Sequence, residues 1–254
     1  MSMGLGSNTS VDSVLFRYRS GYKETNAFLA VPNVATPMPA LVLASDVFGL
    51  DEHIKDLAMR FAQQGYAVLA PDFYSAKGGP GPTQTLDQRS KIRRASADTL
   101  AVKDVNSGFD YLLRENYINK QRVGVIGFGY GGTVAMLAAA SNRNIAACVN
   151  FYGEINYPRS LISRTKPNSP LEMVRFVNCP LLALYGAPEV DISRDDVRVL
   201  EQELRAKAKL FEIKVYPNAA NGFANDMRPE VYQSEVSRDA FLRTFAFLQE
   251  FLKR

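Results

Sequence analysis

The chain has 254 residues and 46% of them are hydrophobic, which is enough for one large α/β domain with a buried core. Its net charge of +4 is mild, and the basic run at residues 89–94 lacks interleaved aromatic residues, so we expect no nucleic-acid partner. No apolar run has signal-peptide or membrane-spanning length, which predicts a cytoplasmic protein with no membrane partner.

The predicted elements alternate between strand and helix after an antiparallel pair of strands at residues 14–20 and 26–32. Further strands are predicted at 40–45, 66–71, 123–128, 145–152, 181–186 and 210–217. Helices are predicted at 53–64, 95–114, 130–141, 195–207 and 229–252. This alternation predicts an α/β fold with a mostly parallel central sheet and helices on both faces. No repeat or linker divides it, so we expect one domain over residues 1–254.

Two irregular stretches, at residues 78–85 and 155–170, each follow the C-terminal end of a predicted strand. Ligands bind at that edge of an open α/β sheet, so these stretches are expected to wall or cover a small-molecule pocket. The two cysteines, Cys148 and Cys179, are too few for a disulfide framework and lack the spacing of a metal site. We expect buried thiols, no metal, no cofactor, and a monomer or small homo-oligomer.

Residues 123–133 read VGVIGFGYGGT, a buried strand that enters a tight glycine turn and then a helix. That order is typical of the turn on which an α/β-hydrolase carries its nucleophile, and Gly129 occupies the central position. Residues 216–226 read YPNAANGFAND and are typical of the loop that carries the catalytic histidine, where Asn221 stands. The only histidine, His53, lies upstream at the start of a predicted helix and is expected to pack there. No pair of nucleophile and histidine can therefore form in the chain order of this fold.

Four segments in the same order resemble the dienelactone hydrolase family, namely residues 42–75, the GFGYGG turn at 127–132, and residues 184–193 and 216–226. The resemblance covers nearly the whole chain. It implies an α/β-hydrolase fold that hydrolyses carboxylic esters or lactones, with a pocket for a small molecule at the C-terminal ends of the strands.

Carried over position by position, the resemblance places the family's nucleophilic cysteine at Gly129, its catalytic aspartate at Glu189 and its histidine at Asn221. Asp191, two residues after Glu189, is the other candidate for the acid. The family glutamate that contacts the resting thiol corresponds to Asp46, which is one methylene shorter. All three triad positions depart from the family pattern. The resemblance therefore implies a hydrolase fold, whereas the residues at these positions supply neither the nucleophile nor the histidine that hydrolysis requires.

Other parts of the site do not depend on the lost side chains. The fold forms its oxyanion hole from the backbone N–H of the residue after the nucleophile and one from an earlier loop, here Tyr130 and Val47. Tyr152 and Phe223 are expected to line the pocket. Asp46 is a candidate acid or base, or simply a ligand of loop N–H groups.

A competing interpretation comes from the same glycines, since Gly127, Gly129 and Gly132 match G-x-G-x-x-G after a strand and before a helix. Glu154 then lies about where a ribose-binding acid is found in dinucleotide-binding domains. That fingerprint normally opens its domain, whereas some 120 residues precede it here, so this interpretation ranks last.

The residues leave three further functions open. The first is a small-molecule-binding pseudoenzyme that keeps the pocket and has lost the reaction. The second is a repurposed lyase, isomerase or cyclase, in which the oxyanion hole stabilises an enolate while Asp46 or Glu189 moves a proton. The third is a hydrolase that activates water without a nucleophile, which Asn221 disfavours because an amide is not a general base near neutral pH.

Overall fold

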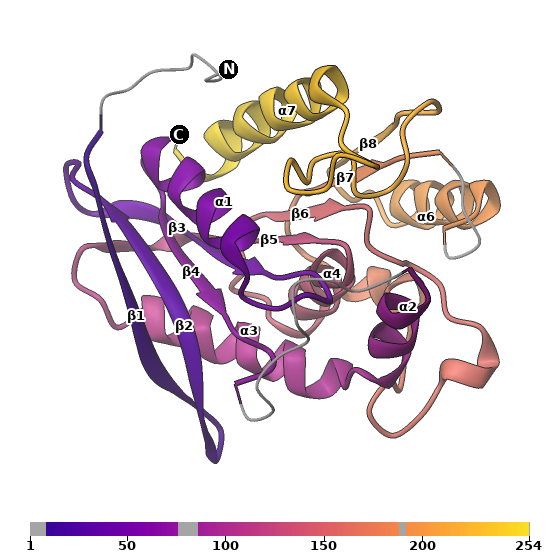
Figure 1. The fold of residues 1–254 in the computed structure, drawn as a ribbon, viewed down its shortest axis with the longest axis horizontal. Helices are drawn as coiled ribbons and strands as arrows, with labels where there is room; N and C mark the ends of the chain where they lie inside the picture. Colours follow the sequence, from indigo (N-terminus) through magenta and orange to yellow (C-terminus); the bar gives the residue numbers. More distant parts are fainter. Residues whose placement is uncertain (1–8, 76–85, 188–191, 254) are drawn as a thin grey trace.

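The computed structural model describes residues 9–75, 86–187 and 192–253, and one eight-stranded sheet runs through it in the order β1-β2-β4-β3-β5-β6-β7-β8 (Figure 1). The strands are β1 Val11–Ser20, β2 Lys23–Pro32, β3 Met38–Ala44, β4 Ala67–Pro71, β5 Ile118–Phe128, β6 Cys148–Phe151, β7 Leu181–Tyr185 and β8 Phe211–Val215. β2 pairs antiparallel with both β1 and β4, and every other pair is parallel. The predicted mostly parallel sheet with an antiparallel N-terminal pair is confirmed.

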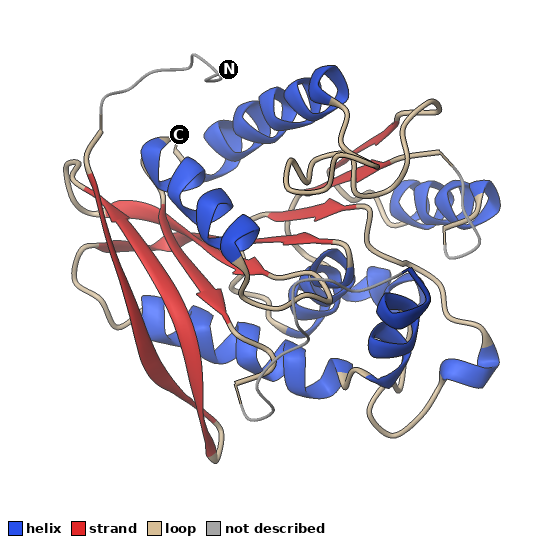
Figure 2. Cartoon of the chain, in the orientation of Figure 1, coloured by secondary structure: helices blue, strands red, loops and turns tan. Residues whose placement is uncertain are grey.

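Helices cover both faces of this sheet, as predicted (Figure 2). They are α1 Glu52–Gln63, α2 Leu86–Ala95, α3 Asp98–Leu112, α4 Tyr130–Ser141, α5 Pro170–Met173, α6 Arg194–Ala206 and α7 Ser234–Leu252, with 3-10 turns η1 Arg159–Leu161 and η2 Val174–Phe176. α1 and α7 pack on one face, and α3 and α4 pack on the other. Within the described ranges, no helix combines the length and the apolar character that a membrane span requires.

The centre of the sheet and the helix that follows it are buried. The last six residues of β5 and nearly all of α4 are inaccessible to solvent, because α4 is apolar on every side and lies between the sheet, α3 and η2. The turn that joins β5 to α4 therefore rests on a closely packed base. A site at this turn is held by rigid elements rather than by a mobile loop.

The structure differs from the predicted elements at two helix ends. The helix predicted at 95–114 is α3, which begins only at Asp98 because Ala97 is extended. The preceding helix α2, in which the Ser96 hydroxyl donates to the Ile92 carbonyl just after the last turn, was not among the predicted helices. The helix predicted from residue 229 begins at Ser234, because the Gln233 N–H instead donates to the carbonyl of Phe223 at 3.1 Å. Of the two predicted irregular stretches, 155–170 contains only η1 and the first residue of α5, and 78–85 lies outside the described residues.

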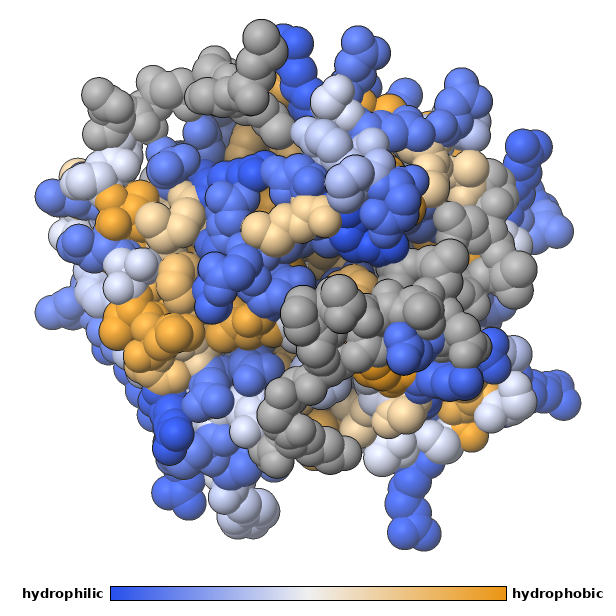
Figure 3. Space-filling view, viewed as in Figure 1, coloured by the Kyte–Doolittle hydropathy of each residue, from blue (hydrophilic) through white to orange (hydrophobic). Residues whose placement is uncertain are grey.

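Strand β1 forms one edge of the sheet and carries exposed apolar side chains. Val14 and Leu15 are 52% and 62% exposed, and Figure 3 shows apolar surface over the β1–β2 hairpin at the left of the view. An exposed strand edge offers unpaired backbone groups to another chain. A monomer or small homo-oligomer remains our prediction for the assembly.

Candidate functional site

The turn between β5 and α4 holds the predicted nucleophile position. Gly129 has φ 54° and ψ −122°, which glycine tolerates and other residues adopt only with strain. Its N–H donates to the Phe151 carbonyl at 2.9 Å, and the Gly132 N–H donates to the Gly129 carbonyl at 2.9 Å. Gly131 lets α4 approach β3, because a Cβ there would lie 2.0 Å from the carbonyl oxygen of Ala44. The turn is thus fixed by β6, α4 and β3 together.

The carboxylate of Asp46 lies directly over this turn. Its Oδ1 accepts the N–H of Val47 at 2.7 Å and the N–H of Tyr130 at 3.0 Å. These are the two backbone donors predicted for an oxyanion hole, and they converge on one oxygen as that function requires. This oxygen is one of the protein's own and not a ligand's. It also lies close to the turn, because a Cβ on Gly129 would be 2.2 Å from Oδ1 of Asp46. Asp46 therefore occupies the space that a nucleophile side chain and a substrate oxyanion would need.

The position predicted for the histidine lies beside the end of β7. Asn221 accepts the N–H of Gly186 through its Oδ1 at 2.9 Å. Gly186 leads from β7 into the predicted acid loop, so residue 221 faces that loop. Its amide holds the backbone there and has no basic nitrogen. Glu189 and Asp191, the two candidates for the acid, lie outside the described residues.

The two residues predicted to line the pocket are instead buried against each other, with Tyr152 6% and Phe223 0% exposed. Tyr152 and Phe223 meet edge to face, with ring centroids 5.2 Å apart. Tyr152 follows β6 with a positive φ of 43°, which marks a strained position for a residue other than glycine. Burial, and to a smaller extent the charge of Asp46, raises the pKa of Tyr152 well above its ordinary value. Its phenol is therefore protonated near neutral pH and close enough to Asp46 to interact with it.

A buried ion pair beside the turn could not be predicted from the sequence. Asp98, the first residue of α3, accepts hydrogen bonds from Lys166 at 2.5 Å, from the Tyr130 hydroxyl at 3.0 Å and from the Tyr157 hydroxyl at 2.7 Å. Asp98 and Lys166 are only 1% and 3% exposed. The side chain of Tyr130, whose backbone supplies one of the two donors, is thereby tied to α3 and to the segment that carries Lys166.

The residues of the dinucleotide interpretation have contacts inside the protein. A Cβ on Gly127 would lie 2.0 Å from the carbonyl oxygen of Gly131, so that glycine allows the turn to close on itself. Glu154, the candidate ribose ligand, is buried with its carboxylate 3.5 Å from the guanidinium of Arg93. Its carbonyl accepts the Thr133 hydroxyl at 2.8 Å. Among the described residues, nothing favours a dinucleotide over the hydrolase-type turn.

The single histidine is buried in α1. His53 lies against Phe128, with ring centroids 6.4 Å apart, and its Nδ1 is 3.4 Å from Oδ1 of Asp226. Asp226 is also paired with Arg60 of the same helix. Burial lowers the pKa of His53 to about 4, because it outweighs the attraction of Asp226. Across the described ranges, no three His, Cys, Asp or Glu side chains form a group that could hold a metal ion.

Stability is expected to depend on the protonation of His53. Its pKa in the folded protein is about 4 and the ordinary value is 6.5, so the unfolded chain binds the proton first as the pH falls. The contribution of neutral His53 to the free energy of unfolding is complete above pH 6.5 and is lost as the pH falls from 6.5 to 4. At pH 4.5 the loss amounts to about 2 to 3 kcal/mol. Urea melts at pH 7 and 4.5 measure this loss. His53→Leu should lose less over the same interval, and an equal loss in both proteins would contradict the assignment.

Residues 25–252 match the family model described as "Dienelactone hydrolase family". A protein of Escherichia coli strain K12 named "Putative carboxymethylenebutenolidase" is 30% identical over 220 residues, which cover 85% of this chain and 78% of that protein. A Bradyrhizobium protein named "Probable 2-oxo-3-(5-oxofuran-2-ylidene)propanoate lactonase" is 30% identical over 228 residues, 88% of each chain. The crystal structure of a "Putative Dienelactone Hydrolase" from Klebsiella pneumoniae matches with a TM-score of 0.87 at 30% identity, covering 95% of this chain and 100% of that one.

Proposed function

The chain belongs to the dienelactone hydrolase family, and we propose that it is a member that binds a small molecule without hydrolysing it. The observation that carries this proposal is the position of Asp46, whose Oδ1 accepts the N–H groups of both Val47 and Tyr130. An ester carbonyl oxygen needs these two donors as it becomes an oxyanion. It must therefore displace a carboxylate of the protein before it can react.

The other parts of a covalent mechanism are also lacking. Gly129 offers no nucleophile, and Asn221 uses its side-chain oxygen to accept the N–H of Gly186. An amide cannot take a proton from an attacking group near neutral pH. Displacement of Asp46 alone would therefore open the oxyanion hole without supplying anything to attack the bound ester.

Asp46 also restricts which ligand the site can accept. The names of the two relatives describe a carboxymethylene-substituted butenolide and an oxofuran-ylidene propanoate as what those proteins act on, so both named compounds carry a carboxyl group besides the lactone ring. For this chain we propose instead an uncharged lactone or ester, held beside Gly129. A free carboxylate is disfavoured because it would approach Asp46, and two like charges at that distance repel.

We expect the wild-type protein to show no covalent turnover of an activated aryl ester. Its rate should not exceed the roughly 10³- to 10⁴-fold over water that binding and an oxyanion hole provide without a triad. Stopped-flow kinetics with p-nitrophenyl acetate measure this, and mass spectrometry of the quenched mixture detects any acyl-protein. Asn221→Ala should leave the rate unchanged, because Asn221 takes no part in proton transfer.

Two results would contradict this proposal. A burst of p-nitrophenol in proportion to protein would show a nucleophile that the described residues do not contain. The second result concerns the melting temperature of the wild-type protein with a lactone or with its ring-opened acid. If the lactone raises it no more than the acid does, the proposed class of ligand is wrong. The matched comparison is Asp46→Asn, which removes the charge at nearly constant shape and should let the acid bind as well as the lactone.

One observation also favours a repurposed, non-hydrolytic enzyme as the second candidate. A carboxylate, that of Asp46, stands where the nucleophile of a hydrolase stands, so it would meet a ligand at the position where a proton is taken or given. In this case the protein should exchange a hydrogen next to the carbonyl of a bound lactone for deuterium in D₂O. Proton NMR follows that exchange. Loss of exchange in Asp46→Asn with binding retained would favour this function over simple binding.

A further inference from the structure

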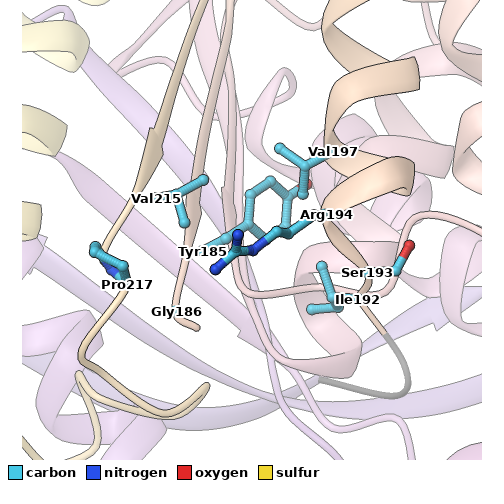
Figure 4. Close-up of a pocket in the computed structure, with 8 residues that line it drawn as sticks. All are labelled: Tyr185, Gly186, Ile192, Ser193, Arg194, Val197, Val215 and Pro217. Carbon is cyan, nitrogen blue, oxygen red and sulfur yellow. The ribbon is translucent and has the colours of Figure 1, made fainter. Parts of the chain in front are cut away.

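A second pocket lies apart from the glycine turn, between α6 and the ends of β7 and β8. Its cavity has a volume of about 310 Å³, which is at the small end of the range for ligand sites. Val215 and Pro217 form one side, and Ile192 and Val197 form the other (Figure 4). The ring of Tyr185 closes the inner end. None of these residues belongs to the triad positions or to the oxyanion hole.

The polar groups around this pocket are mostly bound elsewhere. The Tyr185 hydroxyl accepts from the side-chain amide of Asn150 at 3.1 Å, so the pocket meets only its ring. The Ser193 hydroxyl donates to Asp196 at 2.6 Å as part of the cap of α6. The N–H of Gly186 donates to Asn221 at 2.9 Å. The space is therefore apolar on nearly every side.

Arg194 is the charged residue that lines the pocket. Its side chain reaches from the start of α6 across the pocket toward β7 and β8 (Figure 4). The nearby carboxylates of α6 are used by other groups, because Asp195 is 3.3 Å from Arg198 and Asp196 binds Ser193. No described carboxylate forms an ion pair with Arg194. Arg194 is exposed to solvent, so its guanidinium is open to a ligand at the pocket, and carboxylates fit its two parallel N–H donors.

We propose that this pocket binds a small organic carboxylate with an apolar body, such as a single aromatic ring or a short alkyl chain. The body lies between the Tyr185 ring and the aliphatic side chains, where it loses contact with water. The carboxylate lies at the mouth and accepts two hydrogen bonds from Arg194. This inference goes beyond the proposed function, because the site near Gly129 disfavours anions and this pocket selects them.

The test uses benzoate as the probe and benzamide as its uncharged analogue, titrated into the 254-residue chain and followed by amide NMR. Benzoate should bind saturably and shift the amides of Tyr185, Gly186 and Val215. Benzamide should bind about three- to fivefold more weakly, because an ion pair with an exposed guanidinium contributes only a modest factor. Arg194→Gln should weaken benzoate by the same factor, whereas Arg198→Gln, an exposed neighbour on the same helix that does not line the pocket, should leave it unchanged.

A second variant keeps the charge and removes the space. Val197→Trp fills the pocket from the partly exposed side of α6 and should abolish benzoate binding while the other amide signals stay in place. The proposal is overturned if benzoate does not bind saturably, if benzamide binds equally well, or if Arg194→Gln and Arg198→Gln behave alike. Shifts that gather at Gly129 and Asp46 instead of at Tyr185 would also overturn it. The ester assay on the glycine turn is unaffected by each of these outcomes.

Discussion

A variant that combines Gly129→Cys, Asn221→His and Asp46→Ala is expected to hydrolyse p-nitrophenyl acetate at least about 100-fold faster than the double variant that keeps Asp46. The reason is that Asp46 holds the N–H groups of both Val47 and Tyr130, and the loss of a single oxyanion-hole donor already costs about 10²- to 10³-fold in other hydrolases. Asp46 also lies where the new thiol would be, 2.2 Å from the Cβ position of residue 129. Initial rates of the single, double and triple variants give the comparison.

The introduced imidazole must also lie where it can reach the thiol at residue 129. Residue 221 is suited to it, because Asn221 already reaches Gly186 at the start of the predicted acid loop. Asn218→His puts an imidazole at an exposed position of the same loop and should give no gain, so it is the matched control. In the triple variant the thiol should be alkylated by iodoacetamide at lower pH than in Gly129→Cys alone, because a paired thiol ionises more easily.

The folded state of these variants also needs a check, because a side chain at φ 54° costs about 1 to 3 kcal/mol. Denaturant melts show whether each variant remains folded at the assay temperature. If the triple variant folds, yet its rate equals that of the double variant and its thiol ionises like a free cysteine, then residues 129 and 221 do not meet. The positions carried over from the family would then be wrong.

The sequence was sufficient to predict the sheet and the glycine turn because both depend on local patterns. Apolar runs separated by helical periodicity fix the order of strands and helices, and a glycine in the middle of a strand–turn–helix segment indicates a positive φ. The ends of helices were less predictable. Gln233 bonds to Phe223 rather than starting α7 early, and that contact depends on how two distant turns meet in space.

The position of the Asp46 carboxylate against the two predicted oxyanion-hole donors could be seen only in the structure. The sequence allowed Asp46 to be an acid, a base or a ligand of loop N–H groups, and only the structure shows that its Oδ1 accepts the N–H of Tyr130, 84 residues away. No pattern in the sequence indicated the ion pair of Asp98 and Lys166. Aspartate and lysine are usually exposed in proteins, and these two are buried because the segment around Lys166 packs against α3.

Lys166→Met is expected to lower the free energy of unfolding by about 3 to 5 kcal/mol, because it leaves the buried carboxylate of Asp98 without its cation. The hydroxyls of Tyr130 and Tyr157 still donate to Asp98, but they carry no charge to balance it. Denaturant melts at pH 7 measure the change. Lys120→Met, at an exposed position of β5, should change stability by less than about 0.5 kcal/mol and is the matched control.

The double variant Asp98→Asn with Lys166→Met separates a lost charge balance from lost packing. It removes both charges together, so it should recover about 2 kcal/mol relative to Lys166→Met alone. If the double variant is as unstable as the sum of the two single variants, the pair acts through packing and not through charge. The Tyr130 hydroxyl reports on the site at the same time, since it bonds to Asp98. The amide signal of Tyr130 should therefore shift in Lys166→Met and stay in place in Lys120→Met, because the Tyr130 side chain is bonded to the carboxylate whose cation is removed.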